Sequence, residues 1–239
     1  MDTSERTVEQ YLMSLSIGRV EYEPDGNVPP DFLVDSRIAV EVRRLNQNEE
    51  LDGGYRGLEV TAKPLDAIVT KILGESGPPP GPNSWFVLYT AWRPLPPWKS
   101  IEAMLRSAVH EFREQLDNPP AEMRLARGLR LRFLPASERH ETLLVLGGST
   151  DHDSGGFVVA ELIRNLRFCI PEKDEKIAKY RHKYPEWWLA FEDRIGYGAL
   201  DESDVSALRR ELAVSHQFQR VLLVNPLAAH RAIEIHRSA

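Results

Sequence analysis

The chain has 239 residues, of which 42% are hydrophobic and 28% are charged, and its net charge is −6. This length suits one elaborated domain or a small domain with an insertion, and the apolar content is sufficient for a sizeable core. No run of about 20 apolar residues is present, which excludes a bilayer-spanning helix. The acidic balance argues against a general nucleic-acid coat, because phosphate binding depends on Lys and Arg.

The first residues, MDTSERTVEQYLMSL, carry acids where a signal peptide has a basic region. Cys169 is the single cysteine, so the chain has neither an internal disulfide nor a zinc cluster built on cysteines. A reducing compartment suits such a chain, and we expect a cytoplasmic location with no membrane partner.

Helical spacing predicts a helix over 4–15 with Ser4 as its N-cap. Strands follow at 19–23 and 31–34, and a tight connection over 35–37 leads to a strand over 38–45. In this last strand Glu41 and Arg43 share one face, and the apolar side chains of the other face can pack into a core. We therefore expect Glu41 to face solvent.

The rest of the chain alternates between the two kinds of element. Helices are predicted over 64–73, 101–116, 172–184, 204–213 (with Ser203 as its cap) and 228–235. Strands are predicted over 85–92, 129–135, 142–146, 187–191 and 220–224, with a loop over 46–55 and a flexible linker over 147–156. This order predicts a mixed α/β fold in which a central mixed β-sheet is flanked by helices.

The segment VPPDFLVDSRIAVEVRRL, residues 28–45, carries the chemistry. Asp31 begins one strand and Glu41 lies midway along the next, so a short hairpin would bring their carboxylates together. Two such groups do not easily both stay ionised unless a cation lies between them. Mg²⁺ binds through one or two carboxylates and can activate water at a phosphodiester, and Arg43 could stabilise the charge that develops there.

This pattern resembles the PD-(D/E)XK nuclease superfamily, in which Pro-Asp leads into one strand and acid-X-Lys lies on the next. Pro30-Asp31 matches the first part and Glu41-Val42 the second, but Arg43 stands where the family has Lys. The resemblance implies a restriction-endonuclease-like core, here a single domain over 1–239 with 46–165 as an insertion or sheet extension. It also implies Mg²⁺ or Mn²⁺ held by Asp31 and Glu41.

The resemblance implies two further contributions. An acid on the first helix serves such nucleases as an additional metal ligand, which makes Glu9 a candidate and Glu5 a weaker one. Arginine holds its proton too tightly to act as a base. The lysine role is therefore expected from a neighbouring helix, by Lys176 first and Lys173 second, which lie three residues apart and near one face.

Three interpretations stay open at this point. The first is a Mg²⁺-dependent nuclease acting on DNA, or less favourably RNA, with a homodimer as an open alternative. The second is a nuclease fold that has lost its chemistry and serves as a binding or regulatory module, which the Arg43 substitution and the net charge favour. The third is an unrelated α/β protein.

Two other features of the sequence carry possible functional groups. Asp151-His152-Asp153 invites a metal interpretation, but a mobile surface loop is favoured there. The arginine-rich segment 123–132 and the basic segment 173–183 suit either phosphate contacts or ordinary solvated faces.

Overall fold

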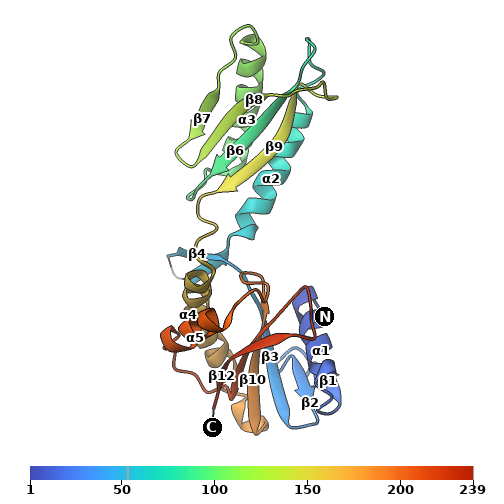
Figure 1. The fold of residues 1–239 in the computed structure, drawn as a ribbon, viewed down its shortest axis with the longest axis vertical. Helices are drawn as coiled ribbons and strands as arrows, with labels where there is room; N and C mark the ends of the chain where they lie inside the picture. Colours follow the sequence, from blue (N-terminus) through green and yellow to red (C-terminus); the bar gives the residue numbers. More distant parts are fainter. Residues whose placement is uncertain (53, 239) are drawn as a thin grey trace. The chain divides into compact units, whose positions relative to one another are not determined.

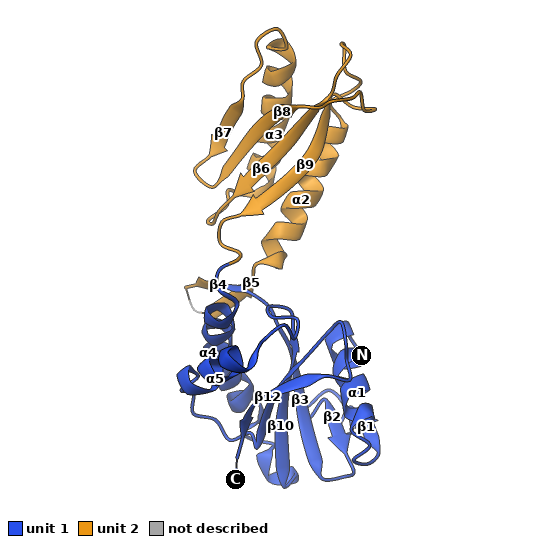
Figure 2. Ribbon diagram, in the orientation of Figure 1, with its two compact units in different colours: residues 1–48, 156–239 blue, residues 49–155 orange. Residues whose placement is uncertain are grey.

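The chain forms two compact units in a computed structural model that describes residues 1–52 and 54–238. Unit 1 combines Met1–Asn48 with Gly156–Ala239, and unit 2 is the continuous segment Glu49–Gly155 (Figure 2). Each unit has its own sheet and its own hydrophobic core. Unit 2 is therefore a separately packed body inserted into the chain of unit 1, and it does not extend the sheet of unit 1.

Unit 1 is built on a six-stranded mixed sheet in the order β1-β2-β3-β10-β11-β12 (Figure 1). The central strands β3, β10 and β11 are parallel, and the other pairs are antiparallel. The strands are β1 (Val20–Tyr22), β2 (Phe32–Val34), β3 (Ile38–Leu45), β10 (Glu186–Asp193), β11 (Arg220–Val224) and β12 (Ala232–Arg237). The helices are α1 (Thr3–Ser14), α4 (Val158–Ile177) and α5 (Glu202–Glu211), with a 3-10 turn at Arg181–Lys183. The predicted mixed α/β fold with a central mixed sheet between helices is confirmed.

The two faces of this sheet carry separate cores. One core joins Val8 and Leu12 of α1 to Val40 and its same-face neighbours on β3. The other joins α4 to Ala39 and Leu45 of β3 and to the facing side chains of β10. Successive residues of a strand point to opposite faces. Glu41 and Arg43 have the parity of Ala39 and Leu45, so they face α4 and not α1.

Unit 2 contains a four-stranded sheet in the order β7-β8-β6-β9. Its strands are β6 (Trp85–Ala91), β7 (Glu122–Ala126), β8 (Leu129–Pro135) and β9 (Leu144–Asp151), and a separate hairpin pairs β4 (Asn48–Leu51) with β5 (Gly54–Gly57). Two helices, α2 (Glu59–Gly74) and α3 (Trp98–Glu114), pack their apolar sides into one core with a single face of the four-stranded sheet. The opposite face of that sheet carries neither helix.

Several predicted elements are correct. The strands over 38–45, 129–135 and 220–224 have the predicted bounds, and strands lie near the other predicted positions at 85–92 and 187–191. The first helix is also present, but its N-cap is Asp2, whose side chain accepts a hydrogen bond from the Glu5 backbone at 2.8 Å. Among the described residues, no helix has both the length and the apolar character needed to cross a bilayer.

Other predicted elements are wrong, and long-range pairing accounts for two of them. The first half of the predicted linker 147–156 is strand, since β9 continues to Asp151 beside β6. The predicted helix 228–235 is replaced by β12, which pairs with β11. Only 172–177 of the predicted helix 172–184 are α-helical, as the end of α4, which begins at Val158 and contains Pro171, and a 3-10 turn follows at Arg181–Lys183. Likewise α2 begins at Glu59, before Pro64, and α5 is capped by Asp201 and not by Ser203.

Candidate functional site

The hairpin of β2 and β3 places Asp31 beside Glu41. Phe32 pairs with Val40, so Asp31, which directly precedes β2, lies next to Glu41 on the same face. Because β2 begins at Phe32, which pairs with Val40, the backbone hydrogen bonds between β2 and β3 do not reach the N–H of Val42. The Asp31 side chain takes over, and its Oδ2 accepts a hydrogen bond from Val42 N at 2.6 Å. This bond fixes the Asp31 carboxylate against β3.

The Glu41 carboxylate is completely buried and is held by two lysines of α4. Its Oε1 accepts a hydrogen bond from Lys173 Nζ at 2.6 Å and a second one from Lys176 Nζ. The two lysines lie one turn apart on the helix, so their ammonium groups converge on one acceptor. The expectation that Glu41 faces solvent is wrong, because α4 covers its face of the sheet and supplies cations there.

The other oxygen of this carboxylate has a different environment. Glu41 Oε2 is buried and accepts no hydrogen bond from any residue in 1–52 or 54–238. Leaving a charged oxygen buried without a partner is costly. This oxygen is the natural position for an additional cation or donor.

The electrostatics of the pair agree with this geometry. Burial raises the pKa of Asp31 to about 6 and the Glu41 carboxylate adds to the rise, although the Val42 N–H, Lys173 and Lys176 oppose it. Burial works to lower the pKa of Lys176, but its hydrogen bond to Glu41 and the nearby charges of Glu41 and Asp31 together outweigh this, so the pKa is raised above the usual lysine value. The site thus has two adjacent carboxylates and two ammonium groups, and both ammonium groups contact the same oxygen of Glu41.

Arg43 does not share in this cluster. Its guanidinium pairs with Glu172 of α4, and its Cζ lies 5.1 Å from the centroid of the Phe168 ring. The charge of Arg43 is thus paired with an acid of the neighbouring helix, and its predicted contact with phosphate stays a prediction. Arg43 instead ties β3 to α4, and Lys173 brings an amine to Glu41 from the helix.

Glu9 is not brought to the site. It lies on α1, whose buried side chains pack on the face of the sheet opposite to Glu41. The same holds for Glu5, which accepts a hydrogen bond from the Tyr22 hydroxyl at 3.1 Å. The sequence could not decide between the faces, because α1 and α4 are both amphipathic and only packing settles which one covers Glu41.

Lys176 connects this buried cluster to solvent. It lines an open pocket of about 500 Å³ between the segment 27–29 and the end of α4. Lys179 and Tyr180 also line this pocket, and Lys179 Nζ lies 4.9 Å from the centroid of the Tyr180 ring. A ligand in the pocket would therefore meet two lysines and an aromatic ring, and Lys176 is the lining residue that also contacts Glu41.

The residues fit a magnesium ion by the chemistry of their donors. Mg²⁺ binds through one or two carboxylates and retains several waters. Asp31 and the free Oε2 of Glu41 supply such oxygens, whereas across residues 1–52 and 54–238 no group of three or more His, Cys, Asp or Glu side chains gathers to hold a metal. Any ion here would be held by this pair alone and would compete with the lysines for Glu41.

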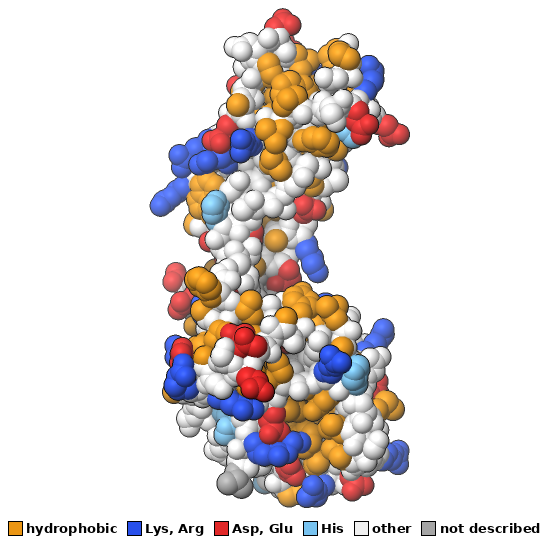
Figure 3. All heavy atoms as spheres, viewed as in Figure 1, with side chains coloured by type: hydrophobic (Ala, Val, Ile, Leu, Met, Phe, Trp, Pro, Cys, Tyr) orange, Lys and Arg blue, Asp and Glu red, His pale blue; other side chains and the backbone are white. Residues whose placement is uncertain are grey.

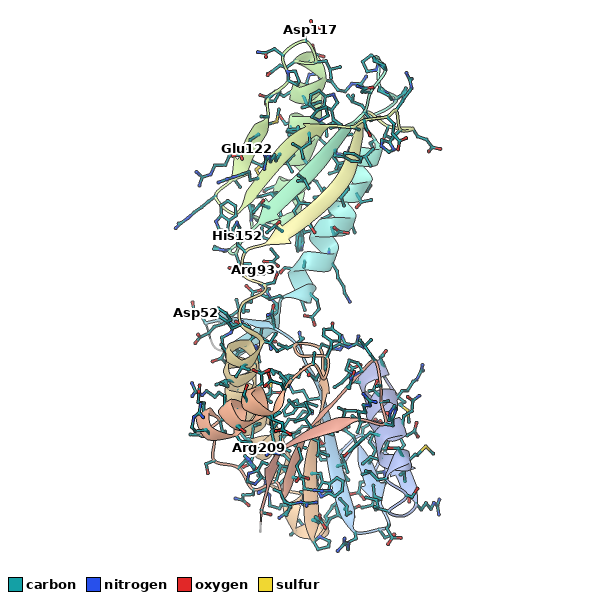
Figure 4. The ribbon with its side chains drawn as sticks, in the orientation of Figure 1. Asp52, Arg93, Asp117, Glu122, His152 and Arg209 are labelled. Atoms are coloured by element: carbon teal, nitrogen blue, oxygen red, sulfur yellow. The ribbon has the colours of Figure 1, made fainter. Side chains whose placement is uncertain are left out.

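The Asp151-His152-Asp153 segment has a structural role in unit 2. Arg93, which is nearly buried and is labelled in Figure 4, donates two hydrogen bonds to Asp151, at 2.7 and 2.8 Å, and a third to Asp153 at 3.1 Å. The same guanidinium donates to the Leu58 carbonyl at 3.0 Å. Both carboxylates are thus engaged by arginine, which agrees with setting aside a metal site in this segment.

Glu172 and Phe168 are the site residues that sequence reasoning missed. The available signal was the spacing of Glu172 with Lys176, four residues apart on one helix, which predicts a shared face. Comparisons of the chain with protein-family models, with curated proteins and with solved structures give no match. The geometry of the Asp31, Glu41, Lys173 and Lys176 cluster is therefore the basis for any functional conclusion.

Proposed function

We propose that this protein is a Mg²⁺- or Mn²⁺-dependent nuclease that hydrolyses phosphodiester bonds in DNA and, as a second choice, in RNA. The observation that carries the proposal is the Asp31–Glu41 pair, in which Glu41 Oε2 is buried without a partner beside a second carboxylate. Two lysines converge on the same group, and one of them lines an open pocket. Carboxylates for a cation, next to ammonium groups for a phosphate, are the combination that phosphodiester hydrolysis requires.

Each residue has a distinct contribution in this proposal. Asp31 and Glu41 would hold the ion, which when bound lowers the pKa of water and neutralises phosphate charge. Lys173, nearly buried, holds the Glu41 carboxylate in position from α4. Lys176, about half exposed, can leave Glu41 to contact a phosphate in the pocket. Release of Lys176 from Glu41 would thus accompany binding of both the ion and the phosphate.

The second candidate is a nuclease fold without chemistry that binds nucleic acid or a regulatory partner. Two observations favour it: both lysines already compensate Glu41, and Arg43 is paired with Glu172. In that case the cluster is a structural ion-pair network, and no cation is needed for its stability.

The deciding experiment is a cleavage assay on labelled single- and double-stranded DNA and RNA with Mg²⁺, with Mn²⁺ and with EDTA. We expect cleavage by the wild type that EDTA abolishes, and its loss in Glu41→Gln, which keeps the side-chain size but removes the charge that holds the ion. Glu192→Gln is the matched control. Glu192 is also fully buried, but it lies on the α1 face of β10, where Ser4 Oγ donates to it at 2.8 Å.

Folding of each variant is checked by circular dichroism before activity is compared. Retention of cleavage by Glu192→Gln together with its loss in folded Glu41→Gln supports the proposal. If the folded wild type cuts none of the four substrates with either ion, the binding module is the correct interpretation. Cleavage that survives Glu41→Gln would place the active site elsewhere.

A further inference from the structure

The uncovered face of the four-stranded sheet in unit 2 has an ordered distribution of side chains. Residues directly opposite on neighbouring strands share a face. Arg124 of β7 pairs with Arg130 of β8, and Glu122 pairs with Arg132. Met123, between them on β7, packs with the helical core. The arginines therefore point away from α2 and α3.

The same face continues across β6 and β9 with apolar side chains. Arg132 is opposite Leu88, Leu134 is opposite Phe86, and Phe86 is in turn opposite Val145 of β9. Gly148 of β9 lies opposite Leu88, and it has no side chain to cover the apolar patch. We call these residues, with Thr90, the open face of unit 2. They form an arginine column along β7 and β8 beside an apolar strip along β6.

Figure 3 views this open face, and its colours show the same division. Orange side chains lie over the middle of the sheet, and blue Lys or Arg side chains project at the β7–β8 hairpin. Unit 2 as a whole contains more acidic than basic residues. The positive charge of this face is therefore a local concentration and does not follow from the composition of the unit.

The arginine column is available for a ligand. Glu122 is the acid of the open face, and it lies 3.3 Å from the Nε of Arg130. Within residues 1–52 and 54–238, Arg124 and Arg132 make no ion pair with an acidic side chain. Both side chains lie at exposed positions. These two guanidinium groups, on the neighbouring strands β7 and β8 and without an acidic partner, complement the phosphates of an anionic chain.

Aromatic rings lie at both ends of the apolar strip. Phe86 is at one end, and Trp92, directly after β6, is at the other, where the Cζ of Arg130 lies 5.8 Å from the centroid of its ring. Phe86 and Trp92 are an even number of residues apart, so both rings lie on the same face, and six residues of strand span roughly 20 Å. Unpaired bases stack on such rings, whereas a duplex keeps its bases stacked on one another and presents mainly phosphate.

From this arrangement we propose that the open face of unit 2 binds a single strand of nucleic acid, with phosphates on the arginine column and bases over the strip of Phe86, Leu88 and Trp92. This surface is separate from the Asp31–Glu41 cluster of unit 1. The proposal stands or falls independently of hydrolysis. A single-stranded polyanion is favoured over a protein partner because the face combines unpaired guanidinium groups with aromatic rings.

The test measures binding by fluorescence anisotropy in EDTA, with the full chain and labelled oligothymidylate, single-stranded RNA and a DNA duplex. EDTA removes the metal that the proposed hydrolysis needs, so this assay measures binding alone, and a loss of binding is distinguished from a loss of hydrolysis. We expect both single strands to bind more tightly than the duplex. Arg124→Ala combined with Arg132→Ala should weaken binding and lower the slope of log K against log salt by about 1.4, because each phosphate contact of a single strand contributes about 0.7.

Two further variants make the test specific. Phe86→Leu keeps an apolar side chain but removes the ring, and we expect affinity to fall about fivefold or more with the salt slope unchanged. Lys63→Ala combined with Lys71→Ala is the matched control, since it removes two charges from exposed positions of α2, on the other side of the sheet. Its affinity should stay within twofold of the wild type.

Three results would overturn the proposal. One is a duplex that binds as tightly as the single strands, and another is an equal loss of affinity in the lysine control and the arginine variant. The third is dimerisation of the wild type, by light scattering, that Leu134→Arg abolishes. Leu134 is 36% exposed in this face, so that outcome would assign the open face to a second copy of the chain.

Discussion

Removal of the two lysines that hold Glu41 is the sharpest test of the cluster. Lys173→Met and Lys176→Met keep most of the side-chain length and remove the charge. The Lys173 side chain is 11% exposed and the Lys176 side chain is 47% exposed, whereas Glu41 is fully buried. The two pairs with Glu41 therefore differ in how much they are screened by water.

The expected magnitudes follow from this difference. Breaking a buried ion pair by removing one partner costs about 3–5 kcal/mol when the remaining charge is left uncompensated. In Lys173→Met, Lys176 still compensates Glu41, so we expect a loss of about 2 kcal/mol in the free energy of unfolding. Lys176→Met should cost no more than about 1 kcal/mol, as is usual for a half-exposed pair.

The double variant is expected to lose more than the sum of the two. With both amines gone Glu41 is an unpaired buried charge, and we expect a cost of about 4–5 kcal/mol, the upper part of the range for a broken buried pair. The coupling free energy should be about 1–2 kcal/mol, within the range of groups that share a partner.

Hydrogen exchange of peptides from β3 and β10 is the suitable assay, because it reports the opening free energy of unit 1 without averaging over unit 2. Exchange of the β6 and β8 peptides in unit 2 is the internal control and should not change. Equal costs for the two single variants, or strict additivity in the double variant, would refute this account of the cluster.

Two other predictions concern Asp31 and Arg93. Because burial raises the pKa of Asp31 to about 6, the folded state binds the additional proton and unit 1 should lose stability as the pH rises from about 4 to about 6. Asp31→Asn should remove that part of the pH dependence of unfolding, and a wild-type curve that is flat or rising in this window would contradict the assignment. Arg93→Lys should destabilise unit 2 by about 2–4 kcal/mol, since a lysine cannot reproduce the forked contacts to Asp151 and the Leu58 carbonyl. Urea unfolding of the variant, with exchange in β3 unchanged, checks this, and a loss below about 0.5 kcal/mol would show that the Arg93 network contributes little.

The sequence by itself determined much of the local structure of the candidate site. The alternation of apolar and polar residues over 38–45 was enough to define β3 and to put Glu41 and Arg43 on one face. The spacing of Lys173 and Lys176 was enough to put both amines on one side of a helix. These features depend on neighbours within a few residues, which is why local pattern is sufficient for them.

Contacts between distant segments decided the rest. Lys173 and Glu41 are 132 residues apart, and only the packing of α4 on β3 turns an acid expected in solvent into a buried one. The same packing leaves Glu9 on the other side of the sheet. β9 and β12 are likewise strands because β6 and β11 supply their backbone partners. Charge burial and strand pairing depend on which surfaces meet in the folded chain, and a local pattern carries no information about the partner.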